Sequence, residues 1–209
     1  MKEKALLHLL QLSDSALPVG AAPHSFGLET LAEEGSLRAE NVEAFLRDHL
    51  EESGALEAVF VRRAWRGDDP RRLGDELSAR KPARESREAS LKLGRRFAEL
   101  VNHLADAPVI PPDLHYCVAF GAAGAAFFVP EQALTLGYLQ QSIAGLVSAC
   151  QRLMPLGQAA ASKIIWNLSS AIANAALREI HSEEVWCFSP FLELASMRHG
   201  SVETRLFIS

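Results

Sequence analysis

The sequence predicts an all-α protein, folded as a single compact domain of about eight to ten helices with a C-terminal tail. Apolar residues recur at helical spacing in several segments, whereas no segment alternates apolar and polar residues as a half-buried strand does. No hairpin dipeptide such as Asn-Gly is present. We therefore expect an all-α domain over residues 1–198 and a separate tail over residues 199–209.

Composition argues against several classes of protein. A chain of 209 residues buries about 70% of its unfolded surface and needs no metal or disulfide to fold. The net charge is −5 and no basic run stands out. We therefore expect no nucleic-acid partner, because contacts with phosphates need a cluster of positively charged side chains. The three cysteines are far apart, which predicts buried, reduced thiols in a cytoplasmic protein. The longest uncharged apolar run, residues 117–129, is too short to span a membrane.

The N-terminal half combines helices with one unusual loop. A leucine-rich helix should open the chain and end in "SDSALPVGAAPHSFGLET" (13–30), where prolines and glycines form a rigid turn before a second helix near Ser25. Asp69 followed by Pro70 predicts the start of a later helix. Between them, one helical stripe consists of Val42, Phe45, Leu46 and Leu50.

The C-terminal half contains longer helices. The three prolines of residues 105–113 must interrupt any helix there, and a long helix should begin at Pro130. A last helix should begin at Pro190, after Ser189 as its cap, and stop at Gly200. We expect Glu88 and Lys92 to pair across one helical turn. The two stripes of this half are Leu93, Phe97, Leu100, Val101 and Leu104, then Ile143, Leu146, Val147, Cys150, Leu153 and Met154.

Charged residues are scarce in the centre of this half. Between Asp113 and Arg178 the only Asp, Glu, Lys or Arg residues are Glu131, Arg152 and Lys163. Either these helices are central and buried all round, or one of their faces is also an interface with another protein.

The sequence contains no recognisable catalytic or metal-binding pattern. His24 and Ser25 resemble a nucleophile elbow, but Pro23 occupies the position of its first glycine and a helix, not a strand, precedes it. The histidines form neither an H-x-x-x-H nor a Glu-x-x-His pair, and "GAAG" lacks the residues that cradle phosphate. We therefore expect no catalytic residue, no metal site and no cofactor.

The tail ends in a cluster of large apolar residues, where chains usually fray. Leu206, Phe207 and Ile208 could fold back onto the core of the same chain. Alternatively they could dock on another protein, with Arg205 as a directional contact. The residues alone leave both alternatives open.

Four segments together resemble the urease accessory protein UreF family. The first is the leucine-rich helix followed by "LPVGA" and "HSFGLE", and the second is "ESREASLKLGRRF" (85–97). The third is "RLMPLGQ" (152–158) and the fourth is the ending "RLFIS". The four occur in the order of the family and cover nearly the whole chain.

The resemblance implies an all-α homodimer without enzymatic activity. Proteins like this help the nickel enzyme urease to mature: they bind the accessory protein UreD, also called UreH, and the complex recruits the GTPase UreG. The assembly acts on apo-urease and inserts nickel in a GTP-dependent reaction. The missing nucleotide and metal motifs agree with this, because UreG holds both.

Matching the motifs residue by residue gives three groups of expected partner-binding residues. The tail group is the one we expect to contact UreD/UreH. The groups are Pro18, Gly20, His24, Ser25, Gly27 and Glu29; Pro155, Leu156, Gly157 and Gln158; and His199, Arg205, Leu206, Phe207 and Ser209.

Other hypotheses remain. The chain could stimulate GTP hydrolysis by UreG, although nothing in the sequence marks one arginine for that role. It could line a passage for nickel. From a different class, it could be an all-α enzyme or small-ligand-binding protein whose helical pocket uses His24, Glu29 or His115.

Overall fold

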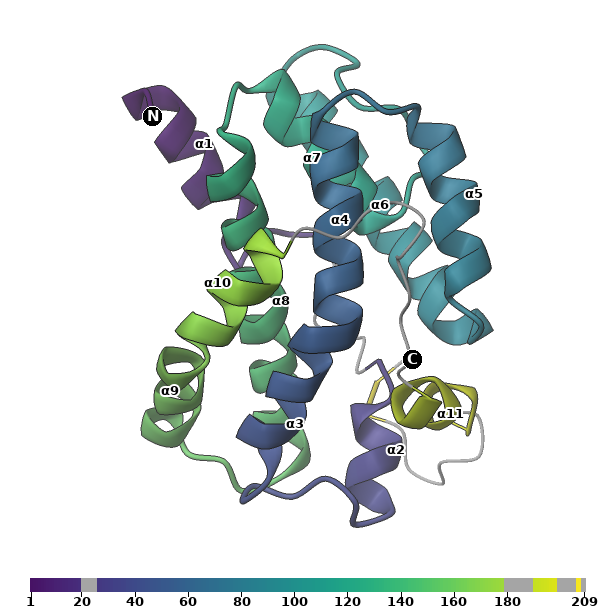
Figure 1. Ribbon diagram of the computed structural model, residues 1–209, viewed down its shortest axis with the longest axis vertical. Helices are drawn as coiled ribbons and strands as arrows, with labels where there is room; N and C mark the ends of the chain where they lie inside the picture. The colour runs from purple at the N-terminus through teal and green to yellow at the C-terminus, as the bar shows by residue number, and fades with distance from the viewer. Residues whose placement is uncertain (20–25, 179–189, 199–205, 208–209) are drawn as a thin grey trace.

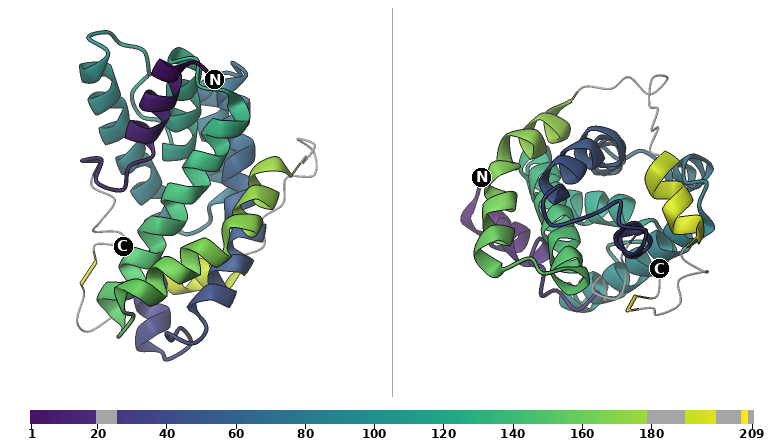
Figure 2. Two further views of the ribbon diagram at one scale, coloured as in Figure 1. Left: turned by 90° about the vertical axis from the view of Figure 1, so that its left-hand side faces the viewer. Right: turned by 90° about the horizontal axis from the view of Figure 1, so that it is seen from below.

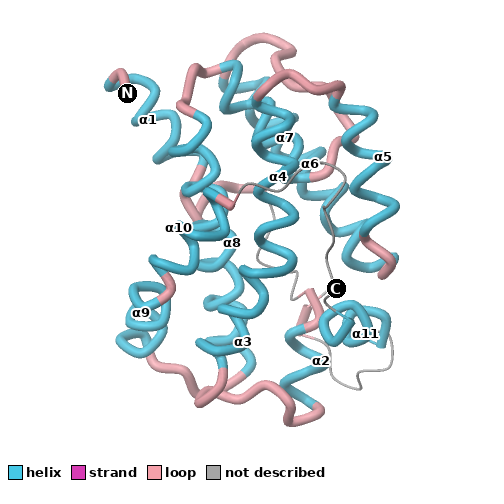
Figure 3. Tube along the Cα trace, viewed as in Figure 1, coloured by secondary structure: helices cyan, strands magenta, loops and turns pink. Residues whose placement is uncertain are grey.

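The computed structural model describes residues 1–19, 26–178, 190–198 and 206–207, and it confirms the all-α prediction. These residues form helices and loops, and none of them lies in a strand (Figure 3). α3, the π-helical turn η1 and α4 follow one another without a break, so the described part contains ten separate helices. No helix in this part is both long and apolar enough to cross a membrane.

The elements follow the chain as shown in Figure 1. Their bounds are α1 (Glu3–Leu12), α2 (Leu28–Glu33), α3 (Val42–His49), η1 (Leu50–Gly54), α4 (Ala55–Trp65), α5 (Pro70–Arg80), α6 (Arg84–Leu104), α7 (Tyr116–Ala126), α8 (Glu131–Leu153), α9 (Gln158–Asn167), α10 (Ser169–Leu177) and α11 (Pro190–Arg198).

The centre of the molecule is the packing of α7 against α4, α6 and α8. α7 carries no charged side chain and is buried along most of its length, as the scarcity of charge in the sequence predicts. Its contact with α4 is unusually close at Gly121. A Cβ atom at this position would lie 2.3 Å from the carbonyl oxygen of Val61, nearer than a real Cβ can approach. Glycine is therefore required at the helix crossing.

Several predicted helix boundaries are confirmed. Asp69 caps α5, because its carboxylate accepts the backbone N–H of Arg71 at 3.0 Å, and Pro70 is the first helical residue. α8 begins directly after Pro130, and α6 ends before the proline-rich connection that starts at residue 105. α11 begins at Pro190, whereas Ser189 and Gly200 lie outside the described residues.

Two details of α6 differ from the prediction. Glu88 pairs with Arg84, one turn before it, at 3.5 Å, and not with Lys92, because both partners are within reach of a helical glutamate. Leu104, the last residue of the predicted apolar stripe, is 50% exposed because the helix ends there, at the edge of the core.

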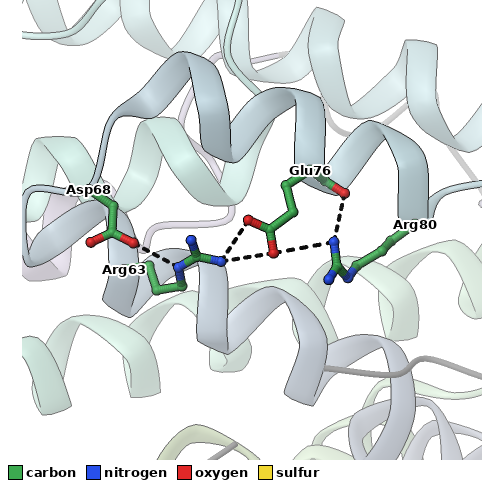
Figure 4. Close-up of polar contacts among 4 residues, drawn as sticks. All are labelled: Arg63, Asp68, Glu76 and Arg80. Atoms are coloured by element: carbon green, nitrogen blue, oxygen red, sulfur yellow. Dashed lines mark hydrogen bonds and ion pairs between the residues drawn. The ribbon is translucent and has the colours of Figure 1, made fainter. Parts of the chain in front are cut away.

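An ion-pair network fixes α5 to α4 (Figure 4). The guanidinium of Arg63 donates to both carboxylate oxygens of Glu76 at 2.9 Å and to Asp68 at 2.8 Å. Arg80 reaches the same Glu76 carboxylate at 3.2 Å. Two leucines of α5, Leu73 and Leu77, are fully buried, so α5 is held both by charges and by the core.

Replacing Gly121 with alanine should lower the free energy of unfolding by about 2 kcal/mol, because the new methyl group forces α7 away from α4. Gly145, in α8, is the matched control, since a Cβ there meets no atom within 4 Å. Gly145→Ala should raise the free energy of unfolding by up to about 1 kcal/mol through helix propensity. Urea unfolding measures both. Equal effects of the two substitutions would contradict the close crossing.

Candidate functional site

Segments from both ends of the chain meet at one corner of the molecule. α11 lies beside α2 (Figures 1 and 2) and also packs against the N-terminal part of α6. Leu206 and Phe207 lie against α2 and the end of α8. We call this region, made of α2, α11, Arg152, Leu206 and Phe207, the α2–α11 corner. It contains residues from three of the four segments that carry the family resemblance, and Ser86 of the remaining segment contacts it.

Gly27 allows α2 and α11 to come together. It is the N-cap of α2 and has a φ of +89°, a left-handed conformation that favours glycine. A Cβ atom here would also lie 2.9 Å from the hydroxyl of Ser196 and 3.0 Å from the carbonyl oxygen of Leu192, both in α11. The "HSFGLE" segment therefore needs this glycine for its backbone and for the space it leaves to α11.

Two polar contacts fix α11 to the start of α6. The hydroxyl of Ser86 donates to that of Ser196 at 3.1 Å, in a buried position. The carboxylate of Glu193 accepts the backbone N–H of Ala83 at 2.8 Å. Ala83 is the N-cap of α6, so a negative charge lies at the positive end of that helix. Ser86 belongs to the second segment of the resemblance, which thus holds α11 in place.

Glu29 holds the end of the chain. Its side chain is only 4% exposed, and its two carboxylate oxygens accept the backbone N–H groups of Leu206 at 2.5 Å and of Phe207 at 3.3 Å. Hydrogen bonds to a charged acceptor are about twice as strong as those between neutral groups. The tail is thus recognised by its backbone, at a carboxylate in the N-terminal segment.

Arg152 completes the contact from the third segment. Its guanidinium carbon lies 4.4 Å from the ring centre of Phe207, a cation–π geometry. Phe207 is 4% exposed, so this part of the tail folds back onto its own chain. Leu206, the residue before it, remains 55% exposed. The tail therefore uses one apolar side chain as an internal anchor and presents the other outward.

Leu206 is not the only large apolar side chain exposed at this corner. In α11, Leu194 is 52% and Met197 45% exposed. Arg198, at the end of α11, pairs with Glu34 at 3.0 Å and ties α11 to the end of α2. The corner thus combines apolar side chains open to contact with a charged pair beside them, as protein–protein interfaces do.

The predicted partner-binding residues distribute as follows. Gly27, Glu29, Leu206 and Phe207 come together at the corner, and Leu156 is buried near the end of α8. Pro18, Pro155, Gly157 and Gln158 are exposed and are not part of the corner. The predicted residues outside the described part of the chain are Gly20, His24, Ser25, His199, Arg205 and Ser209.

Sequence reasoning missed the residues that connect the segments. Ser86, Arg152, Glu193 and Ser196 were not predicted as site residues, although they make the contacts described above. A signal existed for Arg152, because it is one of only three charged residues between Asp113 and Arg178. The serines carry no such signal, since their role depends on which helices are neighbours.

Of the three residues named for a hypothetical ligand pocket, the structure describes Glu29 and His115, and it does not bring these two together. His115 is fully buried in the core, where its Nε2 bonds the hydroxyl of Ser78 at 2.9 Å, while Glu29 holds the tail. Two cavities, of about 180 and 120 Å³, are lined by neither residue. In the part of the chain that the structure describes, no three His, Cys, Asp or Glu side chains are placed to hold a metal ion.

The fold and the corner define an all-helical protein whose candidate site is a surface for contact with another protein. The UreF family profile matches residues 37–169. Urease accessory proteins UreF from Nostoc sp. and Microcystis aeruginosa are 35% and 34% identical, over 97% and 100% of this chain and 95% and 100% of their own. That from Paenarthrobacter aurescens is 32% identical over 97% of both chains. The chain belongs to the UreF family of urease accessory proteins.

Replacing Glu29 with alanine should release the tail, because the backbone N–H groups of Leu206 and Phe207 lose their acceptor. We expect hydrogen exchange at these two amides to become at least about tenfold faster, while the core amides keep their protection. Glu33→Ala, an exposed carboxylate of the same helix, is the control and should change neither. Unchanged exchange in Glu29→Ala would show that the carboxylate does not hold the tail.

Two histidines, His115, which is fully buried, and His49, which is partly buried, should make the protein less stable in mild acid. Burial is the main cause that lowers the pKa of His49 and of His115 to about 4, against about 6.5 in an unfolded chain. Between pH 6.5 and 4 the unfolded state therefore binds more protons, and the free energy of unfolding falls by up to about 1.4 kcal/mol per pH unit for each histidine.

Urea unfolding at pH 7.5 and pH 5 checks this. His115→Gln keeps a hydrogen-bonding group for Ser78 but does not titrate, so the stability lost on acidification should be smaller in this variant than in the unmodified protein. An equal loss in both would show that His115 is not held neutral.

Proposed function

We propose that the protein is a non-catalytic scaffold in urease maturation that binds UreD/UreH through the α2–α11 corner. In that complex it recruits the GTPase UreG for GTP-dependent insertion of nickel into apo-urease. The observation that carries the proposal is the convergence of all four family segments on one corner, which anchors the tail and leaves Leu194, Met197 and Leu206 exposed.

The corner suits a protein partner better than a small ligand. The backbone of Leu206 is fixed by Glu29 and the neighbouring ring lies under Arg152, so the backbone that carries the exposed leucine is ordered before binding. A segment whose backbone is ordered before binding loses less conformational entropy when a partner covers it. A few well-packed residues near the centre of an interface contribute most of its affinity.

The remaining surface leaves room for further partners. Pro18, Pro155, Gly157 and Gln158 are exposed outside the corner, and we assign them to a wider interaction surface used by UreG or by a second copy of the chain in a homodimer. The scaffold needs no cofactor of its own in this scheme, since UreG supplies nucleotide and nickel. We expect any modulation of GTP hydrolysis by UreG to come from the orientation in which this protein binds UreG.

Leu206→Ser should weaken co-purification with UreD/UreH at least about tenfold without lowering the stability of the isolated protein, because the side chain is exposed before binding. Leu177→Ser is the matched control: this leucine of α10 is 45% exposed and lies outside the corner. Truncation after Met197 removes the whole tail and should abolish co-purification while helicity, measured by circular dichroism, stays unchanged. Full partner binding by the truncated protein would refute the corner as the docking surface.

A further inference from the structure

A second cluster of charged residues lies in the interior, away from the exposed surface of the corner. The carboxylate of Glu57, in α4, accepts a hydrogen bond from the ammonium of Lys81 at 2.8 Å and another from the hydroxyl of Tyr138, in α8, at 2.7 Å. The side chains of Glu57 and Lys81 are only 18% and 13% exposed. Neither the docking corner nor the proposed function explains why this buried pair is present.

Both members of the pair are charged at neutral pH. Burial would raise the pKa of Glu57, but the charge and hydrogen bond of Lys81 and the hydrogen bond of Tyr138 outweigh it, so this pKa is lowered. Burial would lower the pKa of Lys81, but the charge and hydrogen bond of Glu57 raise it above its usual value. Burial keeps the neighbouring His49 neutral by lowering its pKa to about 4.

Stability alone does not explain the pair. A buried ion pair is often no more stabilising than apolar side chains of the same size, because both charges lose their water. The helix α5, whose C-cap is Lys81, is already held by two buried leucines and by the network around Glu76. A pair at the end of this helix instead restricts where the following residues run.

Those residues lead directly to the corner. Lys81 is the C-cap of α5, and residues 81–83 connect it to α6. The carbonyl of Lys81 accepts a hydrogen bond from Arg87 at 2.8 Å, and the N–H of Ala83 donates to Glu193 in α11 at 2.8 Å. One side of this short connection is thus bound to the core and the other to α11.

We infer that the Lys81–Glu57 pair is a positioning pair for α11: it fixes the connection 81–83, and through Ala83 and Glu193 it sets the place of α11 at the docking corner. The effect of the pair on partner binding rests on the proposed function. The structural coupling between the pair and α11 does not depend on that function.

Hydrogen exchange of the isolated full chain tests the coupling. The variant Glu57→Gln/Lys81→Met removes both charges and keeps an acceptor for Tyr138, so no unpaired charge remains in the core. Amides of α11 and of the first turn of α6 should exchange at least about tenfold faster, while those of α7 and α8 keep their protection. Leu77→Ala is the control: it weakens the core packing of α5 but keeps the pair, so protection of α11 should be unchanged.

A second variant tests the route. Glu193→Gln weakens the contact with Ala83 and should loosen α11 in the same way. Combined with Glu57→Gln/Lys81→Met, it should add little, because both act through the same connection. Additive effects would overturn the inference, as would unchanged exchange of α11 in a folded Glu57→Gln/Lys81→Met variant.

Partner binding separates this inference from the proposed function. If Glu57→Gln/Lys81→Met loosens α11 and its affinity for UreD/UreH falls about tenfold, both are supported. Lys81→Arg keeps the charge and should retain more affinity than the uncharged variant. If α11 loosens and affinity is unchanged, the positioning role stands and the docking surface proposed above is refuted.

Discussion

The hydrogen bonds between the Glu29 carboxylate and the backbone N–H groups of Leu206 and Phe207 are the contact on which the arrangement of the corner depends. They join an N-terminal helix to the C-terminal tail, two segments separated by almost the whole sequence. Because Glu29 binds backbone N–H groups, it fixes where the tail runs without restricting its side chains. The two side chains have different environments: Phe207 is buried beneath Arg152, and Leu206 is exposed. A single buried carboxylate thus determines which apolar group is available to a partner.

The corner and the core are built by different forces. In the core, α7 lacks charges and packs so closely on α4 that residue 121 must be a glycine. The helices there are held by close apolar packing. α11 also buries Ala195 in the core, but it adds polar contacts with Ala83, Ser86 and Glu34. Polar contacts at a surface are individually weak and directional. An element held in this way can be precisely placed and still respond to a partner, as the proposed docking role requires.

Much of the fold was predictable, because helical periodicity and helix caps are local signals. The stripe of α8, the cap at Asp69 and the burial of residues 117–126 all follow from neighbours in the sequence.

The site was predictable only in part. Glu29 and Phe207 were found through the family resemblance, but their mutual contact was not, because it joins residues 178 positions apart. Ser86 and Ser196 gave no signal, since a serine acquires its role only from the helix that packs on it. The pairing of Glu88 with Arg84 was also not predictable from the sequence, because Arg84 and Lys92 are both one helical turn away from Glu88.

The π-helical turn η1 has a consequence for how this chain can vary. A π turn closes its hydrogen bonds one residue later than an α-helix does, so it contains one residue more than a regular helix of the same course. Removing one residue between Leu50 and Gly54 would restore a regular helix and leave the orientation of α4 relative to α3 nearly unchanged. Removing a residue from the regular turns on either side, with η1 kept, would instead rotate α4 by about 100° relative to α3. Glu57 would then leave the reach of Lys81 and Tyr138, and Val61 would leave its place against Gly121. The long helix from Val42 to Trp65 can therefore lose one residue at η1, but not in its regular turns, without displacing the centre of the protein.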